Sequence, residues 1–120
     1  MLNCKQKGIS TELQCLAAFS KLGIQILIPY GDYARYDIVI DINNIFYRIQ
    51  CKTASLEREG VYKIPCRSTA ANKSRAASRS YTKDEIDFFA TIIEDQCYLI
   101  PIEECGGNSK MLRFLPPKNN

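Results

Sequence analysis

Four polar residues, Glu12, Asp37, Gln50 and Lys52, have the types and spacing to act on a phosphodiester. Gln50 and Lys52 are two positions apart in RIQCKTA (48–54), so in a strand their side chains share one face. A carboxylate oxygen, a side-chain carbonyl and a main-chain carbonyl form the oxygen-rich ligand set that suits Mg²⁺. Such a cation lowers the pKa of a bound water, which a lysine can hold or deprotonate. These residues therefore indicate hydrolysis of a phosphodiester.

The elements that position these residues follow from the hydrophobic pattern. Apolar residues at helical spacing predict a helix over 8–23, which Gly23 ends. Short apolar runs predict strands over 24–29, 36–41 and 45–53, with a tight hairpin turn at Asn43-Asn44.

The predicted hairpin brings the start of strand 36–41 beside the end of strand 45–53. Asp37 should then lie next to Gln50 and Lys52, and Glu12 should reach the same corner from the helix. In strand 45–53 one face carries the core residues, and the other carries polar side chains. The core face is Ile45, Tyr47, Ile49 and Cys51, and the polar face is Arg48, Gln50 and Lys52.

Apolar runs in the rest of the chain predict further strands. We predict a polar turn at 55–60, a strand at 61–66, two strands within 84–104 that turn near Asp95-Gln96, and a last strand at 111–115. One helix followed by several strands favours one domain over residues 1–120, with a mixed sheet of the α/β or α+β class.

Several kinds of chemistry are excluded by composition. The chain has no histidine, which removes Ser-His-Asp and Cys-His catalysis and any metal site built on imidazole. The six cysteines show no C-x-x-C spacing, so we expect reduced, buried thiols. No apolar run approaches the roughly 20 residues of a membrane span, and the start does not resemble a signal peptide. We therefore expect a cytoplasmic protein that has no contact with a membrane.

A basic segment lies between residues 67 and 83 and contains no acidic residue. This concentration of positive charge is typical of a surface that binds a polyanion such as nucleic acid. The alternative is a solvated loop whose charges only maintain solubility. The candidate DNA-binding residues are Arg67, Lys73, Arg75, Arg79 and Lys83.

The arrangement of Glu12 in the first helix, YD at 36–37 and QCK at 50–52 resembles the PD-(D/E)XK nuclease superfamily. The likeness covers nearly the whole chain. It is strongest to a small branch that includes an intron-encoded homing endonuclease and is related to archaeal Holliday-junction resolvases. The resemblance implies a restriction-endonuclease-like α/β core, with a mixed sheet flanked by helices.

The resemblance also implies a role for each residue of the motif. Asp37 would be the metal-binding aspartate, Cys51 would offer its backbone carbonyl, Lys52 would be the catalytic lysine and Glu12 the acid from the helix. Gln50 stands where the family usually has Glu or Asp, so the metal site has one negative charge fewer. Mg²⁺ is the implied cofactor, and Mn²⁺ should substitute for it.

The implied function is a Mg²⁺-dependent endonuclease of homing or restriction type that acts on double-stranded DNA, and we expect it to be associated with the nucleoid. Because one subunit has one active site and a duplex has two strands, we expect a homodimer or homotetramer. The apolar residues Phe88, Phe89 and Tyr98 are candidates for the interface between subunits. The alternatives are a Holliday-junction resolvase and a DNA-binding module that has lost catalysis.

Overall fold

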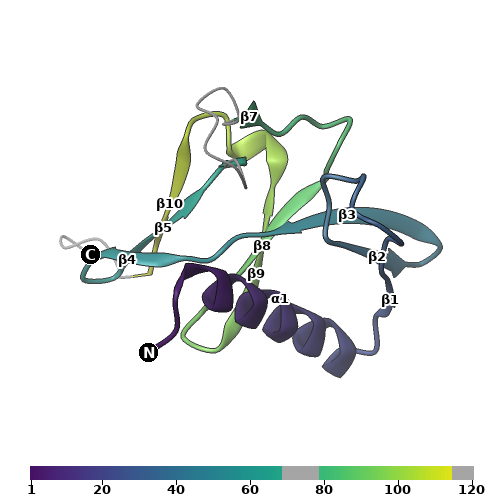
Figure 1. Cartoon of the computed structure of the whole chain (residues 1–120), viewed down its shortest axis with the longest axis horizontal. Coiled ribbons are helices and arrows are strands. Elements are labelled where there is room, and N and C mark those ends of the chain that lie inside the picture. The colour runs from purple at the N-terminus through teal and green to yellow at the C-terminus, as the bar shows by residue number, and fades with distance from the viewer. Residues whose placement is uncertain (69–78, 115–120) are drawn as a thin grey trace.

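The largest element is a five-stranded sheet in the computed structural model, which describes residues 1–68 and 79–114 (Figure 1). Its strand order is β1-β2-β3-β8-β9. β3 and β8 run parallel and all other neighbours run antiparallel, so the sheet is mixed, as the sequence predicts. The strands are β1 (Gln25–Leu27), β2 (Ile38–Ile42), β3 (Ile45–Cys51), β8 (Phe88–Ile93) and β9 (Gln96–Pro101).

Helix α1 (Cys4–Lys21) packs across one face of this sheet (Figure 1). Its buried stripe is Thr11, Cys15 and Phe19, which lie one turn apart. The helix begins four residues before the predicted start because the Asn3 side chain accepts from Gln6 N–H and the Gln6 side chain accepts from Asn3 N–H. Gly23 follows the C-cap with a φ of 76°, which a glycine adopts without strain and which confirms the predicted end.

Two tight turns set the register of the five-stranded sheet. Asn43 and Asn44 have φ values of 54° and 68°, and Glu94 and Asp95 have φ values of 49° and 69°. Positive φ at both central residues is the geometry of a two-residue hairpin turn that matches the twist of its strands. The first turn is where the sequence predicts it, and the second lies one residue earlier than predicted.

A second, three-stranded sheet has the order β10-β5-β4, and β6 (Arg67–Ser68) pairs with β7 (Arg79–Ser80) in a short ribbon. The strands of this sheet are β4 (Ser55–Arg58), β5 (Val61–Pro65) and β10 (Ser109–Arg113). The polar turn predicted at 55–60 is therefore wrong over its first four residues. All residues of β4 are exposed on an edge strand, so no alternation of burial reveals it.

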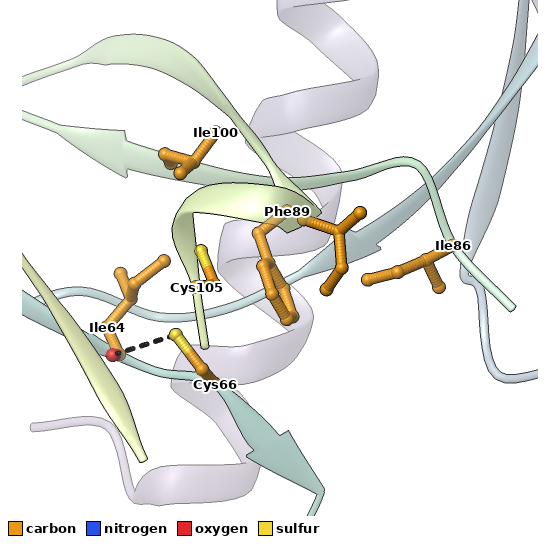
Figure 2. Close-up of a cluster of buried hydrophobic side chains, with 7 residues drawn as sticks. Ile64, Cys66, Ile86, Phe89, Ile100 and Cys105 are labelled. Carbon is orange, nitrogen blue, oxygen red and sulfur yellow. Dashed lines mark hydrogen bonds between the residues drawn. The ribbon is translucent and has the colours of Figure 1, made fainter. Parts of the chain in front are cut away.

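The hydrophobic core has two parts. One lies under α1 and contains Cys15, Phe19, Ile38, Ile40, Ile49 and Ala90. The other joins the two sheets around Phe89, with Ile64, Cys66, Ile86, Ile100, Ile102 and Cys105 (Figure 2). All six cysteines are free thiols, and Cys15, Cys66 and Cys105 belong to these clusters. The expectation that the thiols are buried is wrong for Cys4, which is exposed at the start of α1, and holds only in part for Cys51 and Cys97.

The three rings predicted for a subunit interface differ in burial. Phe89 is fully buried, Phe88 packs edge-on against Tyr47, and Tyr98 packs against Phe114. Phe89 therefore cannot contact a second copy, so the interface prediction is wrong for this ring, whereas Phe88 and Tyr98 are half-buried and keep part of their surface accessible. Within residues 1–68 and 79–114, α1 is the single α-helix, accompanied by a 3-10 turn, η2 (Ile102–Glu104). No helix in these ranges is long and apolar enough to cross a membrane.

Candidate active site

Asp37 lies immediately before β2, beside the end of β3. Its backbone N–H donates to Ile49 O at 2.8 Å, and its Oδ2 accepts a hydrogen bond of 3.0 Å from Cys51 N–H. The pairing of Ile38 with Ile49 continues to this point, so Asp37 stands opposite Gln50. The hairpin thus brings Asp37 to Gln50 and Lys52, as the sequence predicts.

The two faces of β3 separate as expected. Ile49 is fully buried, and Tyr47 and Cys51 pack against the core under α1. On the polar face, Gln50 Nε2 lies 3.4 Å from the carbonyl oxygen of Cys51, at the long limit for a hydrogen bond. The amide and the main-chain carbonyl, both predicted metal ligands, therefore lie together.

Arg48 shares that polar face but belongs to a different group of contacts. Its guanidinium donates to both carboxylate oxygens of Asp87, at 3.0 and 3.1 Å, and to the main-chain carbonyls of Lys83 and Asp84. These bonds fix the segment that leads into β8, and they separate Arg48 from Gln50 and Lys52 at the other end of the polar face.

The Lys52 side chain is half-buried and points toward the base of the β6–β7 ribbon. Its Nζ donates to Arg67 O at 3.1 Å and lies 4.9 Å from the ring centroid of Tyr81. The guanidinium carbon of Arg35 lies 3.8 Å from the centroid of the same ring. Burial lowers the pKa of Lys52; the charge of Asp37 opposes this effect and that of Arg35 adds to it.

Glu12 reaches the same corner from α1, in the middle of the helix rather than in its first turn. Thr11, its neighbour, is buried, and its Oγ1 lies 3.0 Å from Thr53 Oγ1, one residue beyond Lys52. This contact docks the helix at the end of β3. The pKa of Glu12 is raised by burial and by the charge of Asp37, which indicates that the two carboxylates are electrostatic neighbours.

The pKa of the Asp37 carboxyl is also raised, chiefly by burial. The Cys51 N–H and the Lys52 charge favour its ionised form, but they do not outweigh the loss of hydration. Two partly buried carboxylates and an ammonium therefore influence one another electrostatically at one corner of the sheet, an arrangement typical of a site that handles charge.

The family model for PD-(D/E)XK endonucleases matches residues 2–120, nearly the whole chain. The chain belongs to the PD-(D/E)XK endonuclease family. A solved structure, that of the bacterial homing endonuclease I-Ssp6803I, is similar to this family member with a TM-score of 0.73 and 24% identity. The match covers 98% of this chain and 80% of that one, and it confirms the restriction-endonuclease-like fold. Among curated proteins, none matches the chain at a significant level.

The oxygen atoms at the corner formed by Glu12, Asp37 and the end of β3 fit a hard divalent cation. Glu12 and the Oδ1 atom of Asp37 accept no hydrogen bond from residues 1–68 or 79–114, so these oxygens have lone pairs left for a ligand. No group of three Asp, Glu, Cys or His side chains in the same ranges could hold a metal. A cation here would need the Gln50 amide oxygen and the Cys51 carbonyl in addition to the carboxylates.

The basic segment of this family member falls partly within the described structure. Arg79 forms an ion pair with Glu85 at 3.0 Å, and Lys83 forms one with Glu103 at 2.8 Å. The segment has no acidic residue of its own, yet the fold supplies carboxylates from outside it. Arg67 offers its carbonyl to Lys52 at the base of the segment. Lys73 and Arg75 lie outside the described residues.

Arg35 is the site residue that the sequence does not reveal. Its guanidinium donates to Ser80 O at 2.6 Å, Arg79 O at 3.2 Å, Ser68 Oγ at 2.8 Å and Glu85 Oε1 at 2.8 Å. One side chain thereby ties both strands of the β6–β7 ribbon to the loop that precedes Asp37. These partners lie far away along the chain, so no local spacing signals the contact. Thr11 could have been noticed in the sequence, because it is the one hydroxyl-bearing residue in the buried stripe that it forms with Cys15 and Phe19.

Proposed function

We propose that this chain is a Mg²⁺-dependent endonuclease that cuts double-stranded DNA, with the cleavage chemistry at Asp37, Gln50, Cys51, Lys52 and Glu12. The observation that carries the proposal is the position of Asp37 at the end of β3, where its Oδ2 accepts from Cys51 N–H and its charge acts on the neighbouring Lys52. Family membership supports a nuclease, and the oxygen donors at the corner support a hard cation as cofactor. Mn²⁺ has similar ligand preferences and should substitute.

When bound, the cation would lower the pKa of a water and neutralise charge on the phosphate. Asp37, Glu12, the Gln50 amide oxygen and the Cys51 carbonyl would hold it. Lys52 would orient the attacking water and stabilise the additional negative charge on the phosphoryl oxygens. The water oxygen forms the new P–O bond while its proton passes to solvent, the bond to the departing ester oxygen breaks, and that oxygen leaves with a proton from solvent.

The substrate and the assembly are part of the same proposal. A single active site per chain cuts one strand at a time, so a double-strand break calls for a homodimer or homotetramer. Arg67, Lys73, Arg75, Arg79 and Lys83 would contact backbone phosphates, and the protein would act in the cytoplasm, on DNA of the nucleoid. Homing-type and restriction-type cleavage share these requirements.

The decisive experiment measures cleavage of supercoiled plasmid and of a duplex library with randomised sequence, in Mg²⁺, in Mn²⁺ and in EDTA. We expect nicked or linear products with either metal and none in EDTA. Asp37→Asn and Lys52→Met should each lower the rate by at least about 100-fold, because each removes a group that acts on the reacting atoms. Asp95→Asn is the matched control, since Asp95 is exposed and Asn tolerates its positive φ.

Duplex binding in Ca²⁺ separates catalysis from folding and affinity, and both site variants should retain it. Wild-type protein that cleaves no duplex with either metal would overturn the proposal. Cleavage within threefold of wild type in Asp37→Asn or Lys52→Met would remove that residue from the mechanism. Preferential cleavage of a synthetic four-way junction would instead identify a resolvase.

A further inference from the structure

Two tyrosines stand out because their rings are in solvent. Tyr30 is 103% exposed and Tyr33 is 96% exposed, whereas the five other tyrosines of the chain are partly buried. An aromatic ring left in water forgoes the favourable free energy of burial. Tyrosine is also enriched in binding surfaces, because its ring packs and its hydroxyl stays hydrated. Two fully exposed tyrosines are therefore typical of a surface that binds a partner.

The loop that carries them, residues 28–36, lies at the edge of the sheet that holds the active site. Leu27 pairs with Val39, so the chain leaves β1 beside the start of β2. Asp37 is at that start, and the end of β3 lies next to it through the pairing of Ile38 with Ile49. The loop thus runs directly into the catalytic corner, and a substrate bound there would pass over it.

The loop is held at both ends. At one end, the strand pairing of Leu27 fixes the chain, and at the other the guanidinium of Arg35 makes four hydrogen bonds to the β6–β7 ribbon and Glu85. Between them, Gly31 has a φ of 87°, and a Cβ built on it would lie 3.2 Å from Cε2 of Tyr33. A side chain at position 31 would therefore crowd the Tyr33 ring, which itself stays in solvent. A loop whose two ends are fixed loses less conformational entropy on binding than a free loop does.

We propose that Tyr30 and Tyr33 form a substrate-contact pair that packs its rings on the sugar–phosphate backbone of duplex DNA next to the scissile phosphate. This inference rests on the proposed function and adds to it a neutral, aromatic part of the DNA surface. A second copy of the chain is the competing occupant, because Ile28 of the same loop is also 60% exposed. The position of the loop beside Asp37, where a bound duplex would lie under the proposed function, favours DNA.

The test measures binding of the full-length protein to a short duplex of mixed sequence in Ca²⁺, over a series of salt concentrations. The double variant Tyr30→Ser/Tyr33→Ser should bind at least about tenfold more weakly than wild type, as loss of buried aromatic contact residues does. Its slope of log K against log salt should be unchanged, because neutral rings displace no counterions from phosphates. Tyr30→Phe/Tyr33→Phe should retain binding within about threefold, since the rings make the contact.

Phe46→Ser is the matched control. Phe46 is 58% exposed and pairs with Asp41, at the opposite end of the same two strands, so this variant should bind like wild type. Equal binding by wild type and the double serine variant would overturn the inference and leave the proposed function intact. A change in oligomeric state of that variant without DNA would also overturn it, in favour of a subunit contact. Failure of wild type to bind any duplex would overturn both proposals.

Discussion

The carboxylate of Asp37 accepts a hydrogen bond of 3.0 Å from the backbone N–H of Cys51, yet burial still raises its pKa. One oxygen is thereby fixed by the end of β3, and the other has no hydrogen-bond donor among residues 1–68 and 79–114. A carboxylate held in this way is oriented toward a ligand. While no ligand is bound, the ionised carboxylate lowers the stability of the folded protein, because it is partly buried without a full set of partners.

Asp37→Asn should therefore stabilise the metal-free protein at neutral pH while it abolishes cleavage. The folded state binds the Asp37 proton more tightly than the unfolded state, so ionisation above the folded pKa lowers the free energy of unfolding. Asn removes that penalty, and it also removes the charge that raises the pKa of Glu12. The gain should shrink as the pH falls through the raised pKa, where Asp37 is neutral.

Urea unfolding in EDTA, at neutral pH and at a pH near 4, measures this difference. Asp95→Asn removes the same charge at an exposed position and is the control for the loss of a surface charge. A lower urea midpoint for Asp37→Asn than for wild type at neutral pH would contradict this prediction. It would show that the hydrogen bond from Cys51 N–H and the charge of Lys52 stabilise the ionised Asp37 by more than burial destabilises it.

Arg35→Lys should lower the free energy of unfolding by about 2 kcal/mol, although it keeps the charge. The Arg35 side chain is only 16% exposed, and an ammonium cannot make its forked set of contacts to Ser68, Ser80 and Glu85. Arg58→Lys is the control, because Arg58 is exposed on β4 and should change stability by no more than about 0.5 kcal/mol. Equal urea midpoints for the two variants would mean that the Arg35 network adds nothing to stability.

The corner at Asp37 and Gln50 could be predicted from the sequence because its geometry is local. Counting outward from the turn at Asn43-Asn44 brings Asp37 opposite Gln50, and the alternation of β3 assigns the two faces. Glu12 required only a helix that packs on the same sheet. Each step depends on periodicity and one short loop, which are properties that neighbouring residues determine.

The surroundings of that corner depend on contacts between distant parts of the chain, which spacing does not encode. The Lys52 ammonium meets the carbonyl of Arg67, and Arg79 finds its counter-charge in Glu85, beyond the basic segment. β4 was missed because an exposed edge strand has no buried face to reveal it. The helix start was missed because the capping pair of Asn3 and Gln6 precedes the apolar pattern.

Arg79→Ala should reduce the steepness of the salt dependence of duplex binding by roughly one unit of slope, as loss of one phosphate contact does. The Arg79 side chain is 65% exposed although it forms an ion pair with Glu85, so its guanidinium is accessible to DNA. Lys21→Ala removes the same charge at the end of α1 and should leave the slope unchanged. Arg75→Ala should behave like Arg79→Ala on the basis of the sequence. An unaltered slope in the double variant would make the segment a solvated loop.

Thr91→Val should raise the free energy of unfolding by about 1 kcal/mol. Thr91 is fully buried in β8, and its Oγ1 has no hydrogen-bond partner within the described part of the chain. Valine keeps the branched shape and removes the buried hydroxyl. Thr91→Ser keeps the hydroxyl and loses the methyl group, so it should lower stability by about 1 kcal/mol. Urea unfolding of both variants measures this, and a less stable Thr91→Val would contradict it.

Substitution of Gln50 tests how the charge of the proposed metal site affects its need for Mg²⁺. The Gln50 amide lies 3.4 Å from the Cys51 carbonyl oxygen. A neutral oxygen binds a hard cation more weakly than a carboxylate does, so wild type should need relatively high Mg²⁺ and should respond well to Mn²⁺. Gln50→Glu restores the charge at the same length and should lower the Mg²⁺ concentration for half-maximal cleavage. Gln50→Leu removes the oxygen and should raise that concentration or abolish cleavage.

A Mg²⁺ titration of cleavage by the three proteins at fixed salt compares these requirements directly. Gln25→Leu makes the same substitution at an exposed position of β1 and should follow the wild-type curve. Duplex binding in Ca²⁺ confirms that each variant is folded. If Gln50→Leu matches wild type across the titration, the Gln50 side chain is not a ligand of the cation, and the site would have to bind Mg²⁺ through Asp37, Glu12 and the Cys51 carbonyl alone.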